Sequence, residues 1–200
     1  MPATDSRGAP AADCARIFSG LSVDEQAVLD AADAFARKEL YPLARRMDDE
    51  EWWPPDAFRL IGQNGFLGVT ASAQLGGAAM DLFASGLVLQ AFGRWNHALA
   101  LSWAAHENLC LNNILRNANE DQRARYVPGL ADGSLIGALG LTEPGAGSDA
   151  LGSMSTTARR DGDHYVLNGT KLYITNGPVA DVLLVYAKTS PDKGAQGISA

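Results

Sequence analysis

Cysteine is scarce in this 200-residue sequence, which has only Cys14 and Cys110, far apart along the chain. Their spacing matches neither a metal-binding motif nor a disulfide framework, so we expect free thiols in a reducing compartment. Long hydrophobic runs are missing as well, since no apolar stretch approaches the ~20 residues that span a bilayer. The first 20 residues contain no apolar segment of the secretory type and are expected to be a disordered tail. The sequence therefore predicts neither secretion nor membrane insertion.

Positive charge is in deficit, because 16 Lys and Arg residues stand against 23 Asp and Glu, giving a formal net charge of −7. An acidic balance argues against nucleic acid as a partner, since phosphate backbones attract basic surfaces. Histidine is also rare, and the three residues do not have metal-ligand spacing, so no metal site is predicted. His106 lies in an apolar helical pattern and is expected to be a hydrogen-bonded core residue.

The first part of the chain has helical periodicity, and we predict an all-α domain over residues 21–133. Ser22 and Glu25 have the spacing of a capping box at the start of a helix. Pro42 is expected to kink or interrupt that helix, because proline lacks the backbone N–H. Two long buried helices are predicted over residues 81–95 and 98–117.

One more short helix is predicted after residue 118. Asn119 and Gln122 have the spacing of an N-terminal cap, and the helix is expected to end before Pro128. The pattern then changes at about residues 132–134, where we place a boundary between a helical and a β domain.

Residues 134–200 are predicted to form this second domain. An apolar run over residues 135–141 predicts a strand, and Asp161-Gly162 predicts a hairpin turn. Further strands are predicted over residues 155–159, 164–168, 171–175, 181–188 and from residue 197 onward. Because so few short strands rarely close a core, we expect an α+β fold with an incomplete antiparallel β-barrel that is cut short.

The most informative segment covers residues 139–149 (LGLTEPGAGSD). An apolar strand stops at the hydroxyl of Thr142, and Pro144 then fixes the backbone. Gly145 and Gly147 allow a ligand to approach the main chain closely. By itself the segment is equally compatible with a tight turn between two strands, and it is neither a Walker A nor a dinucleotide-binding motif.

Three other segments strengthen the interpretation: residues 101–110 (LSWAAHENLC), the helix over residues 119–128, and residues 173–189 (YITNGPVADVLLVYAKT). Together with the loop, in this order and at this spacing, the chain resembles the acyl-CoA dehydrogenase family. The resemblance extends from about residue 22 to the end, and it is similar in detail to the isovaleryl-CoA and short branched-chain members.

The resemblance implies binding of FAD and oxidation of an acyl-CoA thioester to the 2,3-enoyl-CoA, with hydride transfer to flavin N5. The implied flavin-binding residues are Leu139, Gly140, Leu141, Thr142, Gly147, Ser148, Tyr173, Ile174 and Thr175. Leu141 and Thr142 would donate to the pyrimidine ring, where donors favour the reduced flavin. Tyr173 stands where tryptophan is common in the family, and Thr175 would lie near N5. Ser148 would also contact the CoA portion of the substrate.

The family resemblance also implies what this chain lacks. The catalytic glutamate of the family lies in a C-terminal four-helix domain, which is absent here, while Glu143 in the loop is not the family's base. We therefore expect a fragment without a catalytic residue of its own, whose full-length relative is an enzyme. Loss of a general base costs ~10²–10⁴ in rate, so the fragment alone is expected to be inactive.

Alternatives stay open at this point. The chain is either an inactive truncated product, a flavin or acyl-CoA binding module completed by a partner chain, or a relative that works as an acyl-CoA oxidase or flavin monooxygenase. The family implies an acyl-CoA substrate, an electron-transfer flavoprotein as partner, and a homotetramer or homodimer. The expected location is the cytoplasm, or the mitochondrial matrix in a eukaryote.

Overall fold

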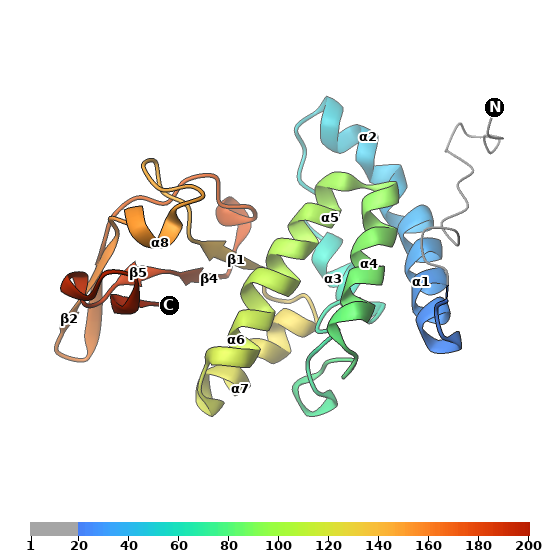
Figure 1. Cartoon of the computed structure of the whole chain (residues 1–200). Helices are drawn as coiled ribbons and strands as arrows, with labels where there is room; N and C mark the ends of the chain where they lie inside the picture. Colours follow the sequence, from blue (N-terminus) through green and yellow to red (C-terminus); the bar gives the residue numbers. More distant parts are fainter. Residues whose placement is uncertain (1–19) are drawn as a thin grey trace.

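A computed structural model describes residues 20–200, so the predicted tail and Cys14 lie outside the described residues. Helices make up the first part of the described chain and short strands the second part (Figure 1). Within the described residues no helix has the length and apolar character needed to cross a membrane. The division into domains at residues 133 and 134 stays a prediction.

The helical part follows the sequence prediction closely. Its α-helices are α1 (Val23–Phe35), α2 (Tyr41–Asp49), α3 (Ala57–Gln63), α4 (Leu82–Trp95), α5 (His97–Ala104), α6 (Asn112–Asn117) and α7 (Glu120–Ala131). Two π-helical segments, η2 (Ala36–Leu40) and η4 (Ala105–Leu111), join α1 to α2 and α5 to α6. A short 3₁₀ turn, η3 (Ala73–Leu75), lies in the long loop between α3 and α4.

Both capping predictions are confirmed. The Ser22 hydroxyl accepts from the backbone N–H of Glu25 at 3.3 Å, and the Glu25 carboxylate accepts from the N–H of Ser22 at 2.6 Å. Asn119 and Gln122 make the same reciprocal pair at the start of α7, at 2.8 and 3.1 Å. These bonds satisfy N–H groups that a helix start otherwise leaves without partners.

The two predictions based on proline have different outcomes. The prediction for Pro42 is confirmed, because the α-helix is interrupted: α1 ends at Phe35, and the π-helical η2 separates it from α2, which has Pro42 in its first turn. Pro128 does not end α7, which continues to Ala131. Val127 and Leu130 are fully buried on either side of Pro128, and their packing holds the last turn in spite of the lost hydrogen bond.

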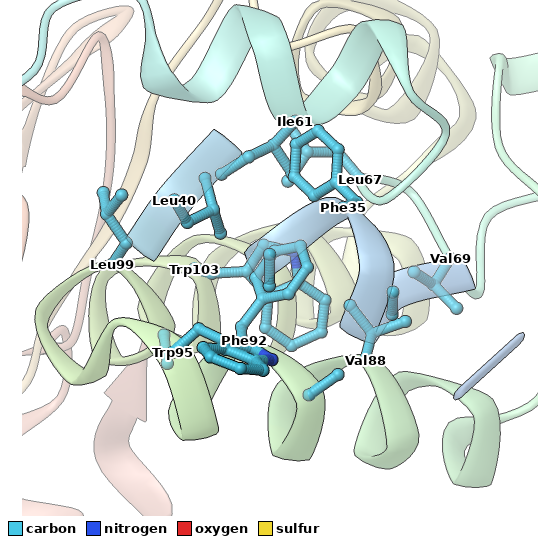
Figure 2. Packing of buried hydrophobic residues seen from close by; sticks show 14 of the residues in the cluster. Phe35, Leu40, Ile61, Leu67, Val69, Val88, Phe92, Trp95, Leu99 and Trp103 are labelled. Atoms are coloured by element: carbon cyan, nitrogen blue, oxygen red, sulfur yellow. The ribbon is translucent and has the colours of Figure 1, made fainter. Parts of the chain in front are cut away.

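The core of the helical part is aromatic and lies between α1, α3, α4 and α5. Phe92 and Trp103 face each other across α4 and α5 with ring centroids 5.8 Å apart, and Phe35 from α1 lies 5.8 Å from Phe92 (Figure 2). Edge-to-face and tilted pairs of this kind add to the stabilisation that comes from burial. This core fixes the long path α5–η4–α6, against which the strands are placed.

The strands are β1 (Gly137–Gly140), β2 (Thr157–Asp161), β3 (His164–Asn168), β4 (Val182–Val185), β5 (Ala187–Lys188) and β6 (Ile198–Ser199). The short helical pieces between them are α8 (Ala150–Ser153), η5 (Gly177–Val179) and η6 (Pro191–Gly197). The hairpin prediction is confirmed, since β2 and β3 pair antiparallel around Gly162, which has a φ of 61°.

The prediction of a purely antiparallel sheet is wrong. β1 pairs with β4 in parallel, and a separate sheet has the order β3-β2-β5-β6, with one parallel contact between β2 and β5. The described residues form no closed barrel. Residues 171–175 are not a strand either, because Tyr173 and Asn176 adopt left-handed φ values of 56° and 65° and bend the chain.

His106 joins the helical part to β1. Its ring is fully buried, with Nε2 2.9 Å from the carbonyl oxygen of Leu130 and Nδ1 accepting from the N–H of Gly137 at 3.0 Å. Burial lowers the pKa of His106 to about 4, so the ring is neutral at pH 7. The prediction of a hydrogen-bonded core histidine is confirmed. Cys110 on the same helical path is a free, buried thiol, as predicted.

Candidate functional site

One edge of β1 is available for a ligand. On the other edge, the carbonyl oxygens of Ile136 and Gly140 accept hydrogen bonds from the chain of β4 at 3.1 and 3.0 Å. Successive residues of a strand direct their N–H and C=O groups to opposite edges. Leu139 therefore presents its backbone groups to the edge away from β4, where no described strand pairs. Leu141 is the first residue after β1, and its carbonyl oxygen accepts from the Lys171 ammonium at 3.0 Å.

The turn after residue 170 lies beside this edge. The N–H of Leu172 donates to the carbonyl oxygen of Thr142 at 2.9 Å, which brings the two segments together. The Asn176 amide donates to the carbonyl oxygens of Ser102 on α5 and Gly137 on β1, at 2.8 and 3.1 Å. The turn is thus tied both to the helical part and to the strand, through a residue that the sequence prediction did not single out.

Tyr173 is the most unusual residue of the turn. Its side chain is 86% exposed, and its φ of 56° is a left-handed conformation that a tyrosine rarely adopts. Such a conformation costs of order 1–3 kcal/mol and persists only where surrounding contacts impose it. Ile174 and Thr175 are half-buried beside it. A strained, exposed aromatic ring next to open backbone groups is an arrangement that suits a planar ligand.

The loop over residues 142–149 is compact at its base and open at its tip. Glu143 and Ala146 exchange backbone hydrogen bonds at 3.0 and 3.1 Å, and both are buried. At Gly145 and Gly147 an added Cβ would meet no atom within 4 Å, so the backbone of the tip faces open space. Ser148 is exposed directly before α8. The predicted site residues thus fall into two groups: those at the β1 edge beside the turn, and Gly147 with Ser148 at the exposed end of the loop.

Glu143 has a structural role that the sequence prediction missed. Its carboxylate accepts from the N–H and hydroxyl of Ser155, both at 2.6 Å, from the N–H of Thr156 at 3.0 Å, and from the ammonium of Lys171 at 2.8 Å. Burial by itself would raise the pKa of Glu143, but these hydrogen bonds and the ammonium hold it well below its usual range. Glu143 therefore stays ionised in its ion pair.

Glu107, next to His106 on η4, is a second buried carboxylate that sequence reasoning missed. It accepts from the N–H groups of Gly68 and Val69, both at 2.8 Å, and so anchors the loop between α3 and α4. Burial raises its pKa to about 7, against the lowering effect of the backbone donors. Neither carboxylate belongs to a metal site, because the described residues contain no group of three or more His, Cys, Asp or Glu suited to a metal.

Comparison with known proteins identifies the family. Residues 22–134 match the family described as "Acyl-CoA dehydrogenase, N-terminal domain", and residues 138–200 match "Acyl-CoA dehydrogenase, middle domain". The chain therefore belongs to the acyl-CoA dehydrogenase family, as its motifs predicted.

The relatives are similar over most of this chain. Mitochondrial isovaleryl-CoA dehydrogenase of Bos taurus is 43% identical over 178 residues, which are 86% of this chain and 40% of the relative. A solved complex of glutaryl-coenzyme A dehydrogenase with glutaryl-CoA has a TM-score of 0.86 and 35% identity, over 91% of this chain and 47% of the other. The FAD complex of PigA has a TM-score of 0.85 and 32% identity, over 91% and 48%. The chain spans less than half the length of each of these proteins.

Proposed function

We propose that this chain forms the flavin-facing wall of an FAD-dependent acyl-CoA dehydrogenase that acts on a short, branched acyl-CoA thioester. The observation that carries the proposal is the open edge of β1 beside the Tyr173 turn. FAD bound at this wall would supply the hydride acceptor of the reaction. The membership of the chain in the family and its similarity to isovaleryl-CoA dehydrogenase support the reaction type and the substrate class.

The donor set fits the pyrimidine part of a flavin. Leu139 offers a backbone N–H and C=O and Leu141 a backbone N–H, whereas the Leu141 carbonyl oxygen is bound by the Lys171 ammonium at 3.0 Å. This set matches a ring whose edge carries both acceptors and a donor. Thr142 directly follows Leu141, and its hydroxyl is a further candidate donor to the ring. Hydrogen bonds from donors at this position would strengthen as negative charge grows on the ring during reduction, so they would favour the reduced flavin.

The other residues complete the wall. The exposed ring of Tyr173 offers a stacking surface, and Thr175 offers a hydroxyl for the edge of the flavin where the hydride arrives. Gly147 and Ser148 offer accessible backbone and a hydroxyl to a phosphate of FAD or of CoA. The chain thus orients the ring and excludes water from one of its faces.

Proton transfer requires a group outside this chain. Glu143 is ionised but is held by Lys171, Ser155 and Thr156, so its carboxylate is not free to remove the α proton of a thioester. We propose that a carboxylate base, a homodimeric or homotetrameric assembly, and reoxidation by an electron-transfer flavoprotein belong to the complete protein. Oxygen consumption in place of reduction of that flavoprotein would instead identify an oxidase.

The test is a titration of FAD with the 200-residue chain, in which the change in flavin fluorescence reports binding. Tyr173→Ala is expected to weaken binding roughly 5- to 150-fold, since a base stacked on an aromatic side chain contributes about 1–3 kcal/mol. Tyr165→Ala is the matched control, because Tyr165 is 60% exposed on β3, away from the β1 edge. Equal effects of the two substitutions, or no binding by the wild type, would refute the proposal.

Substrate turnover is tested on the same complex. Isovaleryl-CoA is expected to leave the absorbance of FAD bound to this chain unchanged, because the base is missing. Bleaching of the flavin by isovaleryl-CoA would show that this chain already contains the base.

A further inference from the structure

The ion pair between Lys171 and Glu143 is almost completely buried. The Lys171 side chain is 11% exposed and that of Glu143 only 1%, with 2.8 Å between Nζ and Oε1. The same ammonium donates to the carbonyl oxygen of Leu141 at 3.0 Å. A buried pair is held in one geometry when additional hydrogen bonds satisfy its charges, and here Ser155 and Thr156 bind the carboxylate.

The Lys171–Glu143 ion pair lies close to the end of β1, where we place the flavin pyrimidine ring. Leu141 directly follows β1, which ends at Gly140, and its carbonyl oxygen is the group that meets Lys171. A full positive charge therefore lies 3.0 Å from the carbonyl oxygen of Leu141, the residue whose N–H we assign to the flavin pyrimidine ring. The Glu143 carboxylate lies 2.8 Å from the ammonium and opposes its field.

We propose that Lys171 and Glu143 shift the reduction potential of the flavin in opposite directions. Lys171 is a positioning residue that raises the potential, and Glu143 lowers it. This inference rests on the proposed function. Reduction places negative charge on the pyrimidine ring, and a nearby cation stabilises that charge more strongly in a water-excluded site than in solvent. A carboxylate at the same site has the opposite effect.

The experiment is a potentiometric titration of FAD bound to the chain and to its variants. Lys171→Met is expected to lower the affinity for reduced relative to oxidised flavin about tenfold, which is ~30 mV for a two-electron couple. Glu143→Gln is expected to raise that ratio by a similar factor. Lys171→Arg keeps the charge and should keep the wild-type potential.

The opposite signs of the two expected shifts in reduction potential distinguish this role from simple structural support of the loop. If the pair only holds the loop in place, both substitutions weaken flavin binding and the potential either stays constant or moves in one direction. That result overturns the inference while leaving the proposed function intact. If Lys171→Met does not fold, two tests remain. Glu143→Gln should raise the reduction potential of the bound flavin, and Lys171→Arg should leave it unchanged. Failure of either expectation overturns the inference.

A second readout uses the chain without flavin. The backbone nitrogen of Thr142 follows the Leu141 carbonyl, so its NMR shift reports the hydrogen bond from Lys171. We expect this shift to change in Lys171→Met and to stay constant in Lys188→Met, a lysine on β5. An unchanged Thr142 signal in Lys171→Met overturns the inference. Complete absence of flavin binding by the wild type overturns the proposed function, and the inference with it.

Discussion

The buried ring of His106 predicts a specific loss of stability in acid. Nδ1 accepts from the N–H of Gly137, so the proton of the neutral ring resides on Nε2, which donates to Leu130. A second proton on Nδ1 would face the Gly137 N–H, so that two donors would oppose each other in a fully buried site. The pKa in the folded protein is about 4, against 6.5 for an unperturbed histidine, and burial is the main cause.

The sign and size of the effect follow from these two values. Because the pKa is lower in the folded state, the unfolded chain binds more protons below pH 6.5, and stability is lost as the pH falls from about 6.5 toward about 4. At about 1.36 kcal/mol per pKa unit, the full loss is about 3 kcal/mol, most of which is reached at pH ~4.5.

His106→Gln is the matched perturbation. The glutamine amide offers an acceptor to Gly137 and a donor to Leu130, but it does not titrate. Urea unfolding of both proteins at pH ~7.5 and ~4.5 gives the free energy of unfolding of each. We expect the difference between them to change by about 2–3 kcal/mol in favour of the variant at the lower pH. Taking the difference cancels the titration of all other groups.

The control is His164→Gln, because His164 lies exposed on β3. Its stability difference from the wild type should be nearly the same at the two pH values. The reasoning fails if the His106→Gln difference is independent of pH, or if the two variants behave alike.

Other predictions concern local contacts. Glu107 has a pKa of about 7, above its usual 4.5, so the stability it contributes is present below about pH 4.5 and is lost as the pH rises through about 7. Glu107→Gln should remove this dependence, which is worth about 2–3 kcal/mol between pH ~5 and ~8 in urea unfolding. Gly133 has a φ of 76°, and an added Cβ would collide with the carbonyl oxygen of Phe58. Gly133→Ala should therefore lower the free energy of unfolding by at least about 2 kcal/mol. Gly145→Ala is the control, because a Cβ there would lie in open space and should change the thermal midpoint little. Ser22→Ala removes the α1 cap and should cost about 1 kcal/mol in chemical unfolding, and a cost near zero would show that the cap does not form in solution.

Local signals in the sequence determined many features of this protein. The capping boxes at Ser22 and Asn119 and the hairpin at Gly162 were predicted correctly, because each depends on bonds between residues only a few positions apart. The family was also determined by the sequence, since the loop motif and its neighbouring segments are read in order along the chain. The contacts of the predicted flavin residues with a flavin stay a prediction.

Only the tertiary structure decided the features that join distant segments. The parallel pairing of β1 with β4 brings together residues about 45 positions apart, and neither segment carries a local signal for its partner. Burial of Leu130 kept α7 helical beyond Pro128, and the tie of Asn176 to α5 bent a segment that reads as a strand. Hydrogen bonds between Glu143 and Lys171 likewise depend on how the loop and the turn meet. In each case the free energy comes from burial and long-range hydrogen bonds, which exist only once the chain has folded.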